Sequence, residues 1–206
     1  MKSTRSFFLY GSWFPGFVHH KWLEQFIDDA QAAYIKGSVY RSNVGYPILI
    51  NEGTDRIPGV LAQITGPSAL FLLMDEFHGI SAMNPEASVF QRFEAQVFIG
   101  DEVTQAQAYA MPKMRVSPRW PRIVGGDWVN QLKNQPDLVS TLSDSQKIYL
   151  SRLGASKGKE GVPSDLTVYR ELLKLDLIVD RGRRVGLSKL GKEVVKYLPQ
   201  FSERVH

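Results

Sequence analysis

The chain has 206 residues, of which 43% are hydrophobic and 11% aromatic, so it can bury the core of one large domain or of two small ones. It contains no cysteine, which excludes disulfides, cysteine-ligated metal sites and thiol catalysis. The excess positive charge lies in the last third, with 13 basic and 9 acidic residues from Asp137 to His206 against 12 of each before. This asymmetry indicates two modules with different surfaces.

The beginning of the chain does not have the pattern of a targeting segment. The apolar run at residues 7–10 ends at Gly11 and is shorter than a signal peptide requires. No window approaches the 18 or so consecutive apolar residues of a membrane-spanning helix. We therefore expect a cytoplasmic protein without a membrane partner.

Short apolar runs separated by turn residues predict a strand-rich first part. The expected strands are at residues 7–10, 32–36, 37–40, 47–50, 59–64, 90–99 and 105–111, with a turn at 51–54. A helical or irregular segment is expected around residues 21–29, and a helix is expected at 69–77, where good helix formers end at Gly79. Many short strands with few helices predict a small, mostly antiparallel β-barrel.

The pattern changes after Asn130. Helices are predicted at residues 142–150, 164–174 and 190–198, with a hairpin around a basic turn at 177–187. The predicted fold class is therefore α+β, with one domain at residues 1–130 and a second at 137–206.

Several motifs together resemble one family. Residues 10–16, YGSWFPG, resemble the "YGSL-x-PG" opening of the γ-glutamylcyclotransferase-like (AIG2-like) proteins. Further steps of that family's pattern are matched, in order and at similar spacing, by residues 37–40, 45–47, 58–61, 73–79, 90–92 and 126–128. The resemblance implies a barrel of this type over residues 7–128 and does not extend to the last part of the chain.

The resemblance also implies a chemistry. Enzymes of the family let the α-amine of a γ-glutamyl group attack its own γ-carbonyl, which releases 5-oxoproline and an amine. A base must first deprotonate the amine, and donors must stabilise the oxyanion that forms. The loop of Tyr10, Gly11, Ser12 and Trp13, together with Gly79, is the expected binding site for a small molecule with an anionic group. The alternative for this loop is a tight turn that binds no ligand. We expect no cofactor.

His78 departs from the family pattern, in which the residue before the glycine is the catalytic carboxylate. The catalytic candidates are His78 and Glu76, although a step of two residues on a helix turns the side chain by about 200°. Three interpretations stay open. His78 is itself the base; the site has lost catalysis and is a ligand sensor or binding module; or another acid, Glu52 or Glu86, enters the pocket.

His19 and His20, with Glu24, invite a metal interpretation. Zinc sites recruit three or four protein ligands, and the sequence offers no third ligand nearby. We therefore expect a solvated surface pair and no metal site.

The end of the chain resembles a winged-helix domain, with Asp176 in the place of its usual glycine. The basic turn would present Arg181, Arg183 and Arg184, which could contact phosphates of a nucleic acid without reading its sequence. DNA binding is one alternative for this domain. A role in packing or oligomerisation, including a homodimer, is the favoured one.

Overall fold

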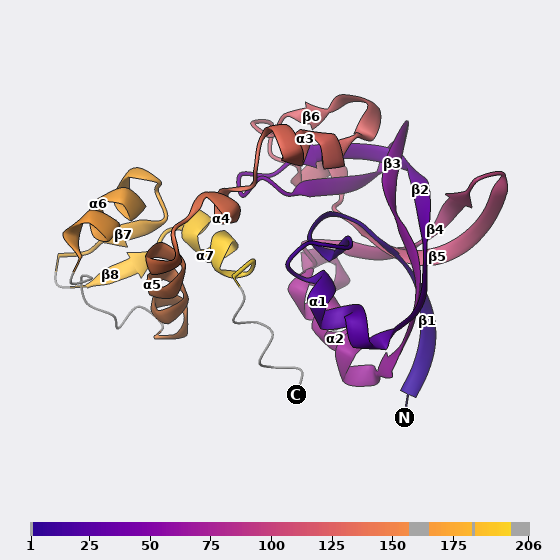
Figure 1. Ribbon diagram of the computed structural model, residues 1–206, viewed down its shortest axis with the longest axis horizontal. Coiled ribbons are helices and arrows are strands. Elements are labelled where there is room, and N and C mark those ends of the chain that lie inside the picture. The colour runs from indigo at the N-terminus through magenta and orange to yellow at the C-terminus, as the bar shows by residue number, and fades with distance from the viewer. Residues whose placement is uncertain (1, 157–164, 183, 199–206) are drawn as a thin grey trace. The chain divides into compact units, whose positions relative to one another are not determined.

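The structure is a computed structural model that describes residues 2–156, 165–182 and 184–198. The chain divides into two compact units, with the boundary between Gln135 and Pro136 (Figure 1). Both units combine helices with strands, so the chain is of the predicted α+β class.

The N-terminal unit is built on one curved sheet. Its strands are β1 (Lys2–Leu9), β2 (Ile27–Arg41), β3 (Pro47–Pro67), β4 (Gln91–Ile99), β5 (Glu102–Ala110) and β6 (Arg122–Ile123). They pair in the order β3-β1-β5-β4-β2-β6, and β3 also pairs with β2, so the pairings of five strands close into a ring. Among the described strands all pairings are antiparallel except β1 with β5, which meet in parallel at one residue pair, Phe7 opposite Gln107.

Strands β2 and β3 are longer than the sequence predicted. The helical or irregular segment predicted around residues 21–29 ends earlier than predicted, because β2 begins at Ile27. Residues 28–32 are exposed, so the alternation that identifies a half-buried strand is missing there. The predicted turn at residues 51–54 is a bulge inside β3, because Ile50 pairs with Ser38 and Asp55 with Gly37.

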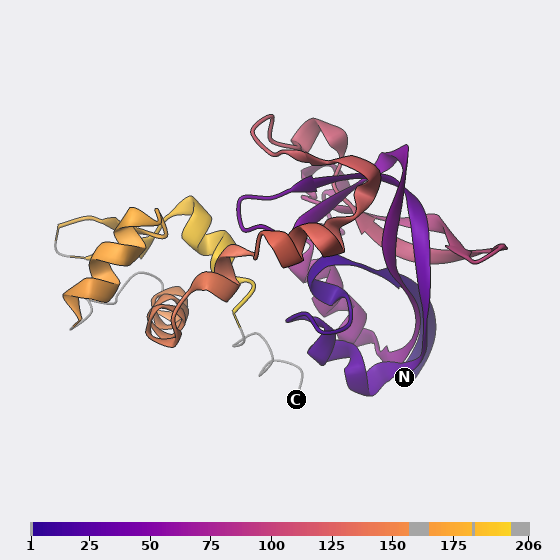
Figure 2. The same ribbon diagram turned by 45° about the horizontal axis from the view of Figure 1, so that its top comes forward.

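The helix predicted at residues 69–77 is confirmed as α2 (Ser68–Phe77). Leu70, Phe71 and Met74 are its buried residues, and Gly79 follows it with a φ of +64°, a conformation that favours glycine after a helix. The short helix α1 (His20–Leu23) and α2 both lie within the curve of β2 and β3 (Figures 1 and 2). The unit ends with α3 (Trp128–Asn134), and its 3₁₀ turns are η1 (Gly11–Trp13), η2 (Glu24–Phe26), η3 (Pro85–Ala87), η4 (Lys113–Arg115) and η5 (Val124–Gly126).

The C-terminal unit has its elements in the predicted order. They are α4 (Leu138–Thr141), α5 (Asp144–Ala155), α6 (Leu166–Lys174), the hairpin β7 (Ile178–Asp180) and β8 (Val185–Leu187), and α7 (Lys189–Val195). Ser143 caps α5, and its side chain and that of Gln146 form a reciprocal capping box. The winged-helix assignment stays a prediction.

In the described parts of the chain, no helix is both long and apolar enough to cross a membrane.

Candidate functional site

The loop after β1 turns sharply at Gly11, whose φ is +59°. The Trp13 N–H donates to the Tyr10 carbonyl at 3.2 Å and closes a 3₁₀ turn. This positive φ favours glycine, and a Cβ at position 11 would also lie in tight contact with the Pro47 ring, at 3.3 Å. Within the described residues, no acceptor takes a hydrogen bond from the backbone N–H of Gly11 or Ser12. These two donors are therefore available to an anion.

The side chains of Tyr10 and Ser12 fasten this loop to the rest of the unit. The Tyr10 hydroxyl donates to the Tyr109 carbonyl at 3.1 Å and accepts from the Leu49 N–H at 3.2 Å. Ser12 Oγ lies 2.8 Å from His19 Nδ1, and the Ser12 carbonyl accepts from the His19 N–H at 2.9 Å. The side chains of Tyr10 and Ser12 therefore hold the loop in place, and its backbone N–H groups stay the predicted binding groups.

The expectation that His19 and His20 form a solvated surface pair is wrong for His19, which is completely buried. Its ring packs on Phe77, with the ring centroids 4.2 Å apart, and its hydrogen bonds to Ser12 satisfy it in the core. His20 is half-buried, and its Nδ1 lies 3.1 Å from the Trp13 carbonyl. Within the described ranges, no three His, Cys, Asp or Glu side chains are grouped to hold a metal ion.

His78 faces the loop and is 6% exposed. Its Nδ1 lies 2.7 Å from the Met74 carbonyl oxygen, which can only accept, so Nδ1 carries a hydrogen. In the neutral ring the lone pair is therefore on Nε2. The ring stacks on Tyr109, with centroids 3.7 Å apart and planes 3° apart, and Trp13 is stacked with it at 5.8 Å. Phe90 meets it edge-on at 5.4 Å.

The indole of Trp13 presents a buried donor beside this imidazole. Trp13 is 4% exposed, and within the described structure its Nε1 has no hydrogen-bond partner. Phe77 and Trp22 pack edge-on against the indole. An unpaired buried N–H costs free energy, so the indole N–H is a candidate donor to an acceptor atom of a ligand.

The Tyr109 ring on which His78 stacks is held by two charged residues, Asp75 and Arg92. The Tyr109 hydroxyl donates to Asp75 Oδ1 at 2.7 Å, and Arg92 donates to both Asp75 oxygens at 3.0 and 2.8 Å. Burial, and then the hydrogen bond to Asp75, raise the pKa of the Tyr109 hydroxyl well above its usual value. Tyr109 therefore stays protonated, and Asp75 holds the ring on which His78 stacks.

The comparison with protein families agrees with this geometry. The model of the family described as "Gamma-glutamyl cyclotransferase, AIG2-like" matches residues 7–130, which is more than half of the chain. The chain belongs to this family. The resemblance drawn from the sequence motifs is therefore confirmed.

Solved structures are also similar to this AIG2-like chain. YkqA from Bacillus subtilis is 18% identical with a TM-score of 0.49, and the match covers 64% of this chain and 42% of YkqA. An AIG2-like protein from Mus musculus is 15% identical with a TM-score of 0.45, over 57% of this chain and 82% of that one. The uropathogenic E. coli protein c4763 is 15% identical with a TM-score of 0.46, over 64% and 97%. The chain thus spans less than half of YkqA. No curated protein matches it.

Three residues of the candidate site were not predicted from the sequence as site residues: Asp75, Arg92 and Tyr109. Two of them stood inside motifs already quoted for the family, Asp75 in residues 73–79 and Arg92 in residues 90–92. Nothing in the sequence shows that β5 brings Tyr109 between His78 on one side and Asp75 and Arg92 on the other. Their joint role in holding the ring under His78 was therefore not predicted. A strand position says which face a side chain occupies, and not which neighbour it meets.

The acids considered as replacements for His78 lie elsewhere. Glu76 is on the exposed side of α2, and its carbonyl accepts from the Gly79 N–H at 2.9 Å, so the structure does not bring its carboxylate to the buried His78 ring. The exposed Glu52 pairs with Lys113 at 3.0 Å, and Glu86 is exposed. The candidate Gly79 packs against Val89, which a Cβ at position 79 would meet at 3.0 Å, so it ends α2 and shapes the site only through its backbone.

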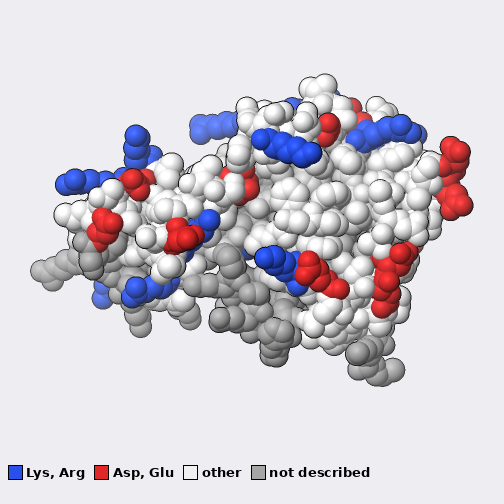
Figure 3. Space-filling view, in the orientation of Figure 1, with Lys and Arg blue, Asp and Glu red and all other residues white. Residues whose placement is uncertain are grey.

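In the C-terminal unit, Arg181 and Arg184 are exposed at the turn between β7 and β8, while Arg183 lies outside the described residues. The Tyr169 hydroxyl binds Asp180 next to this turn, and this hydrogen bond lowers the pKa of the Asp180 carboxyl. On the visible face of the molecule, blue and red side chains are interspersed over the described residues (Figure 3). Within each unit, the described residues drawn on that face form no extended basic stripe of the kind that DNA-binding surfaces present.

Proposed function

We propose that the N-terminal unit is a cyclotransferase that closes the ring of a γ-glutamyl amide and releases 5-oxoproline and an amine. The observation that carries the proposal is the state of His78. Its ring is buried beside the Gly11–Trp13 loop, and the Met74 carbonyl fixes the hydrogen on Nδ1. A neutral imidazole with its lone pair on Nε2 is a base suited to neutral pH.

The loop supports the binding half of the proposal. The backbone N–H groups of Gly11 and Ser12 and the indole N–H of Trp13 are donors without acceptors among the described residues. A γ-glutamyl amide has a carboxylate and a carbonyl that can accept from such donors. Because the donors are held by the turn and by packing, they need little reorganisation when charge develops on the carbonyl oxygen.

In the proposed reaction one base removes two protons from the substrate's α-nitrogen and delivers one proton to the leaving amine. His78 Nε2 takes a proton from the substrate's α-ammonium, and the neutral amine attacks the γ-carbonyl carbon. The new C–N bond closes the ring, and the carbonyl electrons move to an oxyanion that the loop donors stabilise. When the oxyanion collapses, the original amide C–N bond breaks as the imidazolium returns its proton to the leaving amine. The ring nitrogen still carries a second proton from the ammonium; His78 Nε2 removes it, which leaves the single lactam N–H of 5-oxoproline, and releases it to solvent.

The test measures 5-oxoproline released from a set of γ-glutamyl amines and γ-glutamyl amino acids. His78→Phe keeps an aromatic ring on Tyr109 but removes the base, and we expect turnover to fall by at least about 10²-fold, the usual contribution of general-base catalysis. His78→Glu restores the residue of the family pattern and should retain turnover. Asp101→Asn, at the exposed turn between β4 and β5, is the control that should leave it unchanged.

Two results would contradict the proposal. One is unchanged turnover in a folded His78→Phe variant. The other is the absence of turnover in both the natural protein and His78→Glu, which would leave a ligand-binding protein without catalysis. The predicted anionic small-molecule ligand, the homodimer and the cytoplasmic location stay predictions.

For the C-terminal unit we propose a winged-helix-like fold that serves packing or partner binding. The order α5, α6, β7–β8, α7 supports it. The φ of +54° at Asp176 also supports it, because winged-helix domains usually have a glycine at this position. The DNA alternative is tested by gel retardation at low salt. If it holds, Arg181→Ala with Arg184→Ala weakens retardation and reduces its salt dependence.

A further inference from the structure

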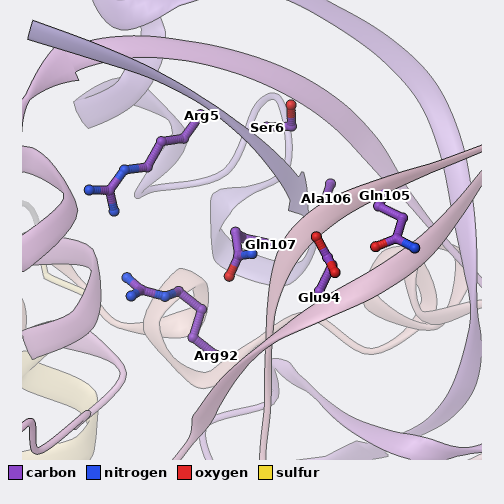
Figure 4. Close-up of a pocket in the computed structure, with 7 residues that line it drawn as sticks. All are labelled: Arg5, Ser6, Arg92, Glu94, Gln105, Ala106 and Gln107. Carbon is purple, nitrogen blue, oxygen red and sulfur yellow. The ribbon is translucent and has the colours of Figure 1, made fainter.

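A cavity lies on the sheet, and the His78 ring is not among its lining residues. It is open, has a volume of about 440 Å³, and is lined by Arg5, Ser6, Arg92, Glu94, Gln105, Ala106 and Gln107 (Figure 4). The volume is in the range of small-molecule sites, which span about 300–1,000 Å³. Neither His78 nor the Gly11–Trp13 loop contributes to its lining, and Arg92 is the one lining residue that also belongs to the network around His78.

The cavity exists because β1 and β5 separate. They pair only at Phe7 and Gln107, while β1 continues to pair with β3 and β5 with β4. Between the diverging strands, Arg5 from β1 and Gln105 from β5 line opposite sides of a wedge. The wedge is a consequence of the fold rather than of one loop, so we expect it to persist in solution.

Arg5 is the cation of the cavity lining that has no ion pair among the described residues. Among the described residues, its guanidinium takes part in no ion pair and lies over the Phe71 ring, 4.2 Å from the centroid. Arg92, the second cation of the lining, is already paired with Asp75 at 2.8 Å. An incoming carboxylate would therefore meet Arg5 as its main partner, and guanidinium is well suited to bind it through two parallel hydrogen bonds.

The unmatched negative charge is Glu94. Its neighbour is the neutral amide of Gln105 which, oriented with its nitrogen toward the carboxylate, donates to Glu94 Oε2 at 2.6 Å. Arg5 and Glu94 line the same cavity without an ion pair between them in the described structure. Figure 4 shows them on opposite sides of the cavity, with Gln107 between them.

We propose that this cavity binds a small zwitterion, a free amino acid or a short peptide, with its carboxylate on Arg5 and its ammonium on Glu94. A simple anion would be repelled by Glu94 and a simple amine by Arg5, so only a molecule with both charges matches both ends. The amides of Gln105 and Gln107 provide the neutral polar surface between the two charges.

The test uses glycine, glycylglycine and triglycine, which carry the same two charges at increasing separation. Binding to the full chain is followed by calorimetry and by NMR shifts of the side-chain amides of Gln105 and Gln107. We expect saturable binding of at least one member of the series. Its N-acetylated and C-amidated forms, which each lack one charge, should bind about tenfold more weakly or worse.

Two variants identify the charges. Glu94→Gln should make the zwitterion and its N-acetylated form bind equally, and Arg5→Gln should do the same for the zwitterion and its C-amidated form. Glu102→Gln, near the tip of the same hairpin and outside the lining, should leave both preferences intact. The proposal is overturned if none of the three zwitterions binds, or if the two preferences survive in folded Arg5→Gln and Glu94→Gln proteins. Because the readout is binding and not 5-oxoproline release, either result is independent of the proposed cyclotransferase.

Discussion

The Tyr109 side chain makes two contacts that both stabilise the candidate site. Its ring supports His78, and its hydroxyl donates to Asp75. Tyr109→Phe keeps the ring and loses a hydrogen bond to a charged group, so we expect the free energy of unfolding to fall by about 1.5–3 kcal/mol near pH 7. Denaturant unfolding measures this loss, and an unchanged midpoint would show that the hydroxyl contributes nothing.

The same residue gives a pH dependence with a definite sign. Burial raises the folded-state pKa of Tyr109 above its ordinary value of 10.0, so the folded state holds this proton more tightly than the unfolded state. The resulting stability is fully present below pH 10 and is lost as the pH rises further. Thermal melts from pH 8 to 12 should therefore show the natural protein losing its advantage over Tyr109→Phe only above about pH 10. A constant difference across this range would contradict the assignment.

Asp176 is the one described residue other than glycine with a positive φ, +54°. Aspartate tolerates this conformation better than most residues, whereas a β-branched residue does not. Asp176→Val should destabilise the C-terminal unit by about 1–2 kcal/mol. The control is Asp176→Gly, which should stay within about 0.5 kcal/mol of the natural chain. Equal losses in the two variants, measured by denaturant unfolding, would mean that the side chain and not the backbone matters.

At the scale of elements, β1 and β3 approach each other very closely at Gly59. A Cβ there would lie 2.3 Å from the Phe8 ring and 2.7 Å from the Leu9 carbonyl oxygen, and the backbone atom cannot move without shifting β1. We expect Gly59→Ala to cost about 1–3 kcal/mol, as overpacking does. Gly66→Ala, in the same strand, meets chiefly the end of the Leu70 side chain at 2.7 Å and should cost less. The reverse order in calorimetric melts would contradict this account.

The sequence predicted elements well where a periodic pattern and its boundary signals coincide. The α2 helix is the clearest case, with a buried face and Gly79 as its end. It failed for β2 and β3, because each strand contains an exposed run, residues 28–32 in β2 and 51–54 in β3, and the bulge at residues 51–54 looks like a turn. For the site, motifs located the loop and His78. The contact of His78 with Tyr109, and through it with Asp75, depends on strand order, which local patterns do not contain.

For the whole molecule, the division between Gln135 and Pro136 predicts that the proposed chemistry belongs to one unit. A chain truncated after Gln135 contains every residue of the family match and of both proposed sites. We expect it to unfold in one cooperative transition and to keep the 5-oxoproline release of the full chain. A truncated protein that folds but is inactive would show that the C-terminal unit takes part in turnover.

The single residue pair between β1 and β5 has a dynamic consequence. A closed ring of strands separates first where the fewest hydrogen bonds must break, and here that junction has one pair while β2 and β3 share a ladder along most of their length. Amide protons at the junction between β1 and β5 should therefore exchange with deuterium well before those between β2 and β3. A guest that bridges the two sides of the wedge would slow that exchange without touching the catalytic loop.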